Sequence, residues 1–194
     1  MTILPLQTDR LLLRFFTPAD DAAIHQLVFA DPEVAGPFCG TTRTLQQVRD
    51  WIVCRAVQAT TDEFGFWAVE RRGDEALLGL VGLQAYVPDW IVWPDDPHPT
   101  YHRIAVETSY AFGRGHWDHG YATEATRAVL DYAFGVLRLP RVAYAVDAAN
   151  QRSVRLMRRL GFTELPNLHP AATGSFLGVL ENDRPRRESI ACAR

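Results

Sequence analysis

Residues 106–125 read Val-Glu-Thr-Ser-Tyr-Ala-Phe-Gly-Arg-Gly-His-Trp-Asp-His-Gly-Tyr-Ala-Thr-Glu-Ala, and this stretch decides the fold. It begins inside a β-rich run over residues 104–112, which predicts a strand, and continues through a Gly- and His-rich turn. Small and apolar side chains then recur at helical spacing over residues 121–137, which predicts the clearest helix of the chain. The stretch is therefore a strand, a turn and a helix in direct succession.

The turn before this helix has the features of an anion site. The first N–H groups of a helix have no partner in a preceding turn, and they lie at the positive end of the helix dipole. Such donors suit a phosphate or a pyrophosphate. Gly120 and the small Ala122 would let a ligand come close to the main chain. Many helices begin after a glycine, so an ordinary strand–turn–helix without a ligand remains an open alternative at this point.

A second informative unit lies thirty residues further on, where a helix is predicted over residues 150–160 and ends at Gly161. At 3.6 residues per turn, Asn150, Ser153 and Met157 fall on one face, which predicts that they point into a common cleft. Four arginines occupy other positions of the helix. We expect most of them on a solvated surface, with one or two in reach of a phosphate.

The rest of the chain predicts strands and helices in a mixed order. Further strands are expected over residues 11–16, 64–70, 76–87, 141–146 and 175–180, and further helices over residues 17–30 and from residue 44. Residues 162 onward return to extended structure. This order predicts an α/β or α+β domain with a mixed sheet. A length of 194 residues is that of one domain, expected over residues 1–182 with a flexible tail over residues 183–194.

Composition narrows the function classes. The formal net charge is −3, whereas a protein that neutralises nucleic-acid phosphates normally carries a basic surplus, so we expect no direct nucleic-acid binding. The three cysteines have neither metal-type nor redox-type spacing, which indicates a reducing compartment and no metal site. The N-terminus lacks the pattern of a signal peptide, and no run approaches the roughly 20 apolar residues of a membrane span. We expect a cytoplasmic protein that does not enter a membrane.

Together these segments resemble the GNAT family of N-acetyltransferases, and within it the branch of ribosomal-protein N-terminal acetyltransferases. The matching segments, in the family's order and spacing, are residues 8–14, 31–34, 66–69, 78–83, 117–125 and 150–162. The resemblance implies a mixed, mostly antiparallel central sheet flanked by helices, with splayed central strands. It also implies transfer of an acetyl group from acetyl-CoA, as cosubstrate, directly to a primary amine.

The resemblance further implies which residues bind the coenzyme. The pantetheine arm would pair with the main chain of one central strand, and the pyrophosphate with backbone amides of the loop that opens the long helix. The residues that match are Tyr110, Ala111 and Phe112 on the strand, Trp117, Asp118, His119, Gly120, Tyr121, Ala122 and Thr123 in the loop, and Asn150 and Ser153 on the second helix.

Two positions of the loop depart from the family's pattern. Trp117 stands where the wider family has Gln or Arg, and Asp118 replaces a common glycine. A carboxylate that turned inward would repel a doubly negative ligand, unless His119, Arg114 or another cation offsets its charge.

The chemistry requires a neutral amine and a proton for the departing thiolate. Glu107 is the candidate general base. A purely structural role for Glu107, as a hydrogen-bond partner, is an equally weighted alternative. The wider family often uses a tyrosine as the acid, but this chain has Met157 there, which donates no proton. Ser153, one turn earlier, is the candidate that hydrogen-bonds the sulfur. The alternative for Ser153 is a helix-interior serine that bonds its own backbone.

The leading hypothesis is an N-acetyltransferase that acts on a protein N-terminal amine. Its alternatives are acetylation of a small amine (an antibiotic, a polyamine or an amino-acid derivative) and a CoA-binding module without transfer activity. Residues 34–38 are expected to line the acceptor side by family analogy. Residues 88–101 carry acidic and aromatic side chains that suit a cationic amine, a second subunit of a homodimer, or solvent alone.

Overall fold

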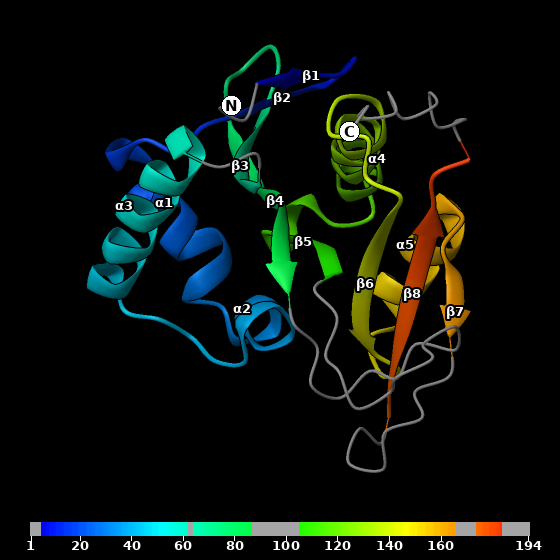
Figure 1. Ribbon diagram of the computed structural model, residues 1–194. Helices are drawn as coiled ribbons and strands as arrows, with labels where there is room; N and C mark the ends of the chain where they lie inside the picture. The colour runs from blue at the N-terminus through cyan, green and yellow to red at the C-terminus, as the bar shows by residue number, and fades with distance from the viewer. Residues whose placement is uncertain (1–4, 62–63, 87–104, 166–173, 184–194) are drawn as a thin grey trace.

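The computed structural model describes residues 5–61, 64–86, 105–165 and 174–183. Its centre is an eight-stranded sheet with the strand order β1-β2-β3-β4-β5-β6-β8-β7 (Figure 1). The strands are β1 (Leu6–Gln7), β2 (Leu11–Arg14), β3 (Gly65–Arg71), β4 (Leu77–Tyr86), β5 (Ala105–Phe112), β6 (Arg141–Asp147), β7 (Thr163–Leu165) and β8 (Ser175–Glu181). Neighbouring strands are antiparallel except β5 and β6, which are parallel. The predicted mixed, mostly antiparallel sheet is confirmed.

The two central strands separate almost as soon as they meet. β5 and β6 share a single register pair, Glu107 with Ala143, whereas β4 and β5 pair over the whole length of β5. Beyond that point, the edge of β5 that faces β6 is not paired with it. The sheet therefore forks between β5 and β6, which confirms the expected splay and leaves main-chain groups available inside the fork.

Helices cover both faces of the sheet. On one face lie α1 (Asp21–Ile24), α2 (Pro32–Cys39) and α3 (Leu45–Thr61), and on the other α4 (Tyr121–Gly135) and α5 (Gln151–Leu160) (Figure 1). Successive side chains of a strand point to opposite faces. On β3, Trp67 accordingly packs in the core with Val129 of α4, whereas Phe66 packs in a separate core with Ile52 of α3. The molecule has three layers, with the sheet between two apolar cores.

The helix predicted over residues 17–30 is less regular than expected. It comprises a 3₁₀ turn, η1 (Pro18–Asp20), then α1, then a π-helical segment, η2 (His25–Phe29). The predicted apolar stripe is nevertheless present, because Ile24 and Val28 are fully buried.

The sequence does not predict α2, because the helix expected over residues 17–30 ends just before the dipeptide Asp31-Pro32 and the next one is expected only from residue 44. The same dipeptide also begins a helix. The Asp31 side chain accepts a hydrogen bond from the Glu33 N–H at 3.0 Å, and Pro32 occupies the first helical turn, where its missing N–H costs nothing. Residues 34–38 therefore lie on a helix, and Val34, Pro37 and Phe38 face the cavity described below.

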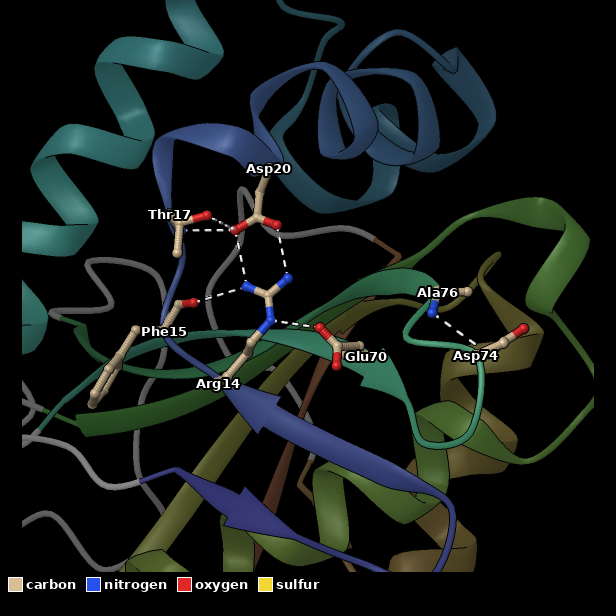
Figure 2. A network of polar contacts seen from close by, with 7 residues as sticks. All are labelled: Arg14, Phe15, Thr17, Asp20, Glu70, Asp74 and Ala76. Atoms are coloured by element: carbon tan, nitrogen blue, oxygen red, sulfur yellow. Dashed lines mark hydrogen bonds and ion pairs between the residues drawn. The ribbon is translucent and has the colours of Figure 1, made fainter.

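The strand predicted over residues 11–16 ends at Arg14, whose guanidinium ties β2 to its surroundings (Figure 2). Arg14 makes two hydrogen bonds to Asp20, of 2.8 and 2.9 Å, and one of 2.6 Å to Glu70 on β3. Burial alone would raise the pKa of Asp20, but Arg14 and the donors of Thr17 lower it below its ordinary value. The network fixes the chain where it leaves the sheet for η1.

Two expectations fall outside the described residues, namely the loop over residues 88–101 and, apart from residue 183, the C-terminal tail. Within the described ranges, the structure contains no helix with the length and hydropathy of a transmembrane segment.

Candidate functional site

A cavity of about 450 Å³ lies at the fork of the sheet. It is lined by α2, by β4, β5 and β6, by the start of α4, and by α5. The candidate catalytic and coenzyme-binding residues all line it except His119, whose ring stacks on that of Tyr121, with centroids 5.7 Å apart. The structure thus brings together two units that lie thirty residues apart in the sequence.

The start of α4 forms one end of the cavity. Gly120 is its N-cap, in the left-handed conformation with φ +79°, and has no side chain that could accept from the N–H groups of the first turn. Asp118 is also left-handed, with φ +63°. A glycine is usual at such a position, and Asp is one of the few other residues that tolerate it. The loop therefore presents the bare N-terminus of a long helix to the cavity, as the sequence predicts.

The Asp118 carboxylate turns outward and has a cationic partner. It is 75% exposed, and its Oδ2 lies 3.3 Å from Nη2 of Arg152. The Arg152 guanidinium in turn lies 4.4 Å from the ring centroid of Trp117. Of the cations considered from the sequence, the one beside this charge is therefore Arg152, not His119 or Arg114. Arg114 pairs with carboxylates of α2, and the His119 Nδ1 lies 2.6 Å from the Trp117 carbonyl oxygen.

The edge of β5 that faces the fork offers main-chain groups selectively. The Phe112 carbonyl accepts a hydrogen bond of 2.7 Å from the Trp117 indole N–H. The Ala111 carbonyl points toward β4, because it lies 2.2 Å from where a Cβ of Gly79 would be. Carbonyls alternate in direction along a strand, so the Tyr110 carbonyl points into the fork. Of the three residues expected to bind pantetheine, the Phe112 carbonyl is bonded to Trp117 and the Ala111 carbonyl points toward β4. The Tyr110 carbonyl is therefore the one that faces the fork without a bond to Trp117.

Glu107 joins both arms of the fork. Its Oε2 accepts from the Gln84 side-chain amide on β4 at 3.2 Å, and its Oε1 accepts from the Ala145 N–H on β6 at 3.3 Å. Burial raises the pKa of Glu107 above its ordinary value, and these two hydrogen bonds offset only part of that effect. The two hydrogen bonds agree with the hypothesis that Glu107 is a structural partner. The raised pKa favours uptake of a proton, which the hypothesis of a general base requires.

Ser153 is buried at the first turn of α5. Its N–H donates to the Asn150 side chain, which caps the helix, at 3.2 Å. Its hydroxyl lies 3.0 Å from the Tyr110 hydroxyl, so it does not simply bond its own backbone. Burial raises the pKa of Tyr110, and Ser153 offsets part of that rise. Both groups therefore remain protonated hydrogen-bonding hydroxyls at neutral pH.

Tyr144 is a cavity residue that the sequence analysis missed. Its ring stacks on that of Tyr110, with centroids 6.0 Å apart and planes 4° from parallel. Burial raises its pKa well above the ordinary value, and Tyr110 raises it further. The alternation Val142, Tyr144, Val146 was the available signal, because it places a polar hydroxyl on the apolar face of a strand.

Met157 does not point into the cleft, which corrects that prediction. It is fully buried, and its sulfur occupies the space beside Gly178 where a Cβ would otherwise lie. Three of the four arginines of α5 line the cavity instead, namely Arg152, Arg155 and Arg159. α5 is therefore rotated so that its basic residues border the site.

Comparison with known proteins agrees with this geometry. A family model described as an acetyltransferase (GNAT) domain matches residues 10–163. The uncharacterized protein YkkB of Bacillus subtilis is 31% identical over 156 residues, which is 80% of this chain and 83% of that protein. An uncharacterized N-acetyltransferase of the same organism, YoaA, is 30% identical over 158 residues, 81% of each chain.

A solved structure shares the fold at lower identity. RimL, a ribosomal alpha-N-protein acetyltransferase in complex with coenzyme A, superposes with a TM-score of 0.72 at 14% identity, covering 94% of this chain and all of its own. Since the family model spans residues 10–163 and YkkB is 31% identical over most of the sequence, this chain belongs to the GNAT family of acetyltransferases.

Proposed function

We propose that this chain transfers an acetyl group from acetyl-CoA to a protein N-terminal amine. One observation carries the proposal: a single cavity is lined at once by the bare N-terminus of α4, by the unpaired edge of β5, and by Glu107 and Ser153. A long phosphorylated thioester needs an anion site and a strand edge with which its extended arm can pair. Transfer of its acetyl group to an amine also needs groups that accept and donate protons.

The coenzyme fits the groups on the cavity wall. The N–H groups at the start of α4 suit a diphosphate, and Arg155 and Arg159 add positive charge on α5. The main chain of Tyr110 suits an extended amide-bearing arm such as pantetheine. Acetyl-CoA supplies the activated acetyl thioester when it is bound.

Glu107 and Ser153 have complementary roles in the proposal. Glu107, whose pKa is raised by burial, accepts a proton from the substrate ammonium and so releases a nucleophilic amine. Ser153 donates a hydrogen bond to the sulfur as the thiolate leaves. This role requires the Tyr110 hydroxyl, 3.0 Å from Ser153 Oγ, to be the donor of the pair, which leaves the serine proton directed into the cavity.

A protein N-terminus is the proposed acceptor for two reasons. RimL, which shares the fold, is described as an alpha-N-protein acetyltransferase. In addition, the Glu107 carboxylate lines the cavity, where it attracts a cationic amine.

The test measures CoA release from acetyl-CoA with a thiol reagent. The amines offered are short peptides, the same peptides with a blocked N-terminus, and a panel of polyamines, aminoglycosides and amino acids. We expect release with free peptides only. CoA release with small amines alone would show that the acceptor is a small amine and not a protein N-terminus. Binding of CoA without its release from acetyl-CoA in the presence of any amine would identify a binding module.

A second measurement tests where the coenzyme binds. Gly120→Val places a branched side chain at the helix N-terminus and should weaken CoA binding at least tenfold by calorimetry. Gly73→Val is the matched control, since Gly73 is also left-handed, at φ +108°, with open space around it in the β3–β4 turn. Equal affinity of both variants would place the site elsewhere.

A further inference from the structure

The turn between β1 and β2 contacts the start of α4, although the two segments lie more than a hundred residues apart in the sequence. The Thr8 hydroxyl and the Arg10 N–H both donate to Oε1 of Glu124, at 2.6 and 3.1 Å. The Arg10 side chain donates to Oε2 from Nε at 2.7 Å. Glu124 lies one turn into α4, so its carboxylate has three donors from the β1–β2 turn.

The Arg10 guanidinium also reaches the loop before α4. Its Nη1 donates to the His119 carbonyl at 3.0 Å, and the group lies 4.7 Å from the ring centroid of Tyr121. Its Nη2 is 3.4 Å from where a Cβ of Gly120 would be. One side chain that does not line the cavity therefore lies beside three successive residues, His119 and Gly120 of the loop and Tyr121 of α4.

This loop needs an external support. His119 stands between two left-handed residues, Asp118 and Gly120, a conformation that few side chains favour. The N–H groups of the α4 terminus bind a diphosphate only if the loop holds them in a converging arrangement. A hydrogen bond to the His119 carbonyl fixes the orientation of the peptide between His119 and Gly120, which lies directly before the first turn of α4.

The same contacts remove an unfavourable charge. Burial alone would raise the pKa of Glu124, but Thr8 and Arg10 lower it, so the carboxylate is ionised at neutral pH. A negative charge one turn from Gly120 repels a diphosphate unless a cation neutralises it. Arg10 is that cation, since its Nη2 also lies 2.6 Å from Oε2 of Glu124.

We propose that Arg10 is a positioning residue for coenzyme binding, which holds the loop over residues 117–120 and neutralises Glu124 from outside the cavity. This inference rests on the proposed function. It gives a role to the Thr8-Asp9-Arg10 segment, which the site itself does not use.

The test compares two ion pairs of equal exposure. Arg10→Met removes the proposed support, where the side chains of Arg10 and Glu124 are 48% and 20% exposed. Arg49→Met is the matched control, because Arg49 and Asp21 are 52% and 19% exposed and pair between α3 and α1. We expect Arg10→Met to raise the calorimetric Kd for CoA and the KM for acetyl-CoA roughly tenfold, the size of one charge-assisted hydrogen bond. The kcat at saturating acetyl-CoA should stay within about twofold, and Arg49→Met should change none of these values.

Two further variants separate support from charge. Arg10→Lys keeps the cation but cannot bond the carboxylate and the carbonyl together, so we expect partial rescue. Glu124→Gln added to Arg10→Met removes the repelling charge and should regain part of the lost affinity. Thr8→Val is the milder variant if Arg10→Met does not fold.

The outcomes are distinguishable. Wild-type affinity in folded Arg10→Met, or an equal loss in Arg49→Met, overturns the role of Arg10 and leaves the proposed function standing. Failure of the wild-type chain to bind CoA at all overturns the proposed function instead.

Discussion

Gly79→Ala is the sharpest test of how β4 and β5 meet beside the site. A Cβ at Gly79 would lie 2.2 Å from the Ala111 carbonyl oxygen and 2.7 Å from Phe112 Cα. Both are main-chain atoms of β5, so no side-chain rotation relieves the overlap. An ordinary carbon–oxygen contact is about 3.3 Å, so the strands must move apart by roughly 1 Å.

The cost follows from that separation. The Gly113 N–H bonds the Leu78 carbonyl at 3.0 Å, and a further ~1 Å takes this bond beyond the useful range. Losing about two such ladder bonds, at ~1 kcal/mol each, with ~1 kcal/mol of overpacking gives a total of about 3 kcal/mol. For a chain of this length, this lowers the Tm by roughly 6–12 °C.

Thermal unfolding followed by circular dichroism measures the effect. Gly115→Ala is the control, because nothing lies within 4 Å of a Cβ there, and its stability should stay within about 0.5 kcal/mol of the wild type. A Tm of Gly79→Ala within about 2 °C of the wild-type value would contradict the argument that β4 and β5 must separate to admit a Cβ at Gly79.

Three other changes address the site and its support. In Glu107→Gln, turnover should fall far more at neutral than at high pH if Glu107 is the base, and a loss independent of pH would indicate positioning alone. Because burial raises the pKa of Glu107, ionisation of this carboxyl destabilises the folded wild type as the pH rises through its pKa in the folded protein. The Tm of Glu107→Gln should therefore exceed the wild-type Tm at neutral pH but not near pH 4. Ser153→Ala should lower kcat roughly 100-fold with little change in the KM for acetyl-CoA, and an unchanged kcat would remove Ser153 from the chemistry. Asp20→Asn should lower the free energy of unfolding by about 2–3 kcal/mol at pH 7. Because Arg14 and Thr17 lower the pKa of Asp20, the difference in thermal stability between the variant and the wild type should shrink as the pH falls below about 3.9. A difference that stays constant with pH would contradict the ion pair.

Local signals in the sequence predict most of the fold. The strand–turn–helix around Gly120 and the helix ended by Gly161 are defined by glycines and apolar periodicity, which act within a few residues. Strands β3 and β4 likewise follow from the β-rich runs over residues 64–70 and 76–87. These elements bring most of the candidate site residues to one cavity, as the family resemblance implies.

What the sequence does not predict depends on distant partners. Helical spacing places Met157 with Ser153 on one face, but a glycine on β8 decides which residues of α5 turn inward. The stack of Tyr144 on Tyr110 requires knowing how β5 and β6 diverge. Likewise, the bond of Arg10 to Glu124 joins residues that lie 114 positions apart in the sequence, and no local pattern reveals it.

The divided sheet also has a consequence for the lifetime of the protein. Main-chain groups of β5 that lack a neighbouring strand form hydrogen bonds when an extended ligand lies in the fork. Such a ligand therefore stabilises the folded protein as well as taking part in the reaction. At a hundred times its Kd, a bound partner adds about 2.7 kcal/mol to the free energy of unfolding. The supply of that molecule would then set how much of this chain survives heat and proteases, as well as how fast it works.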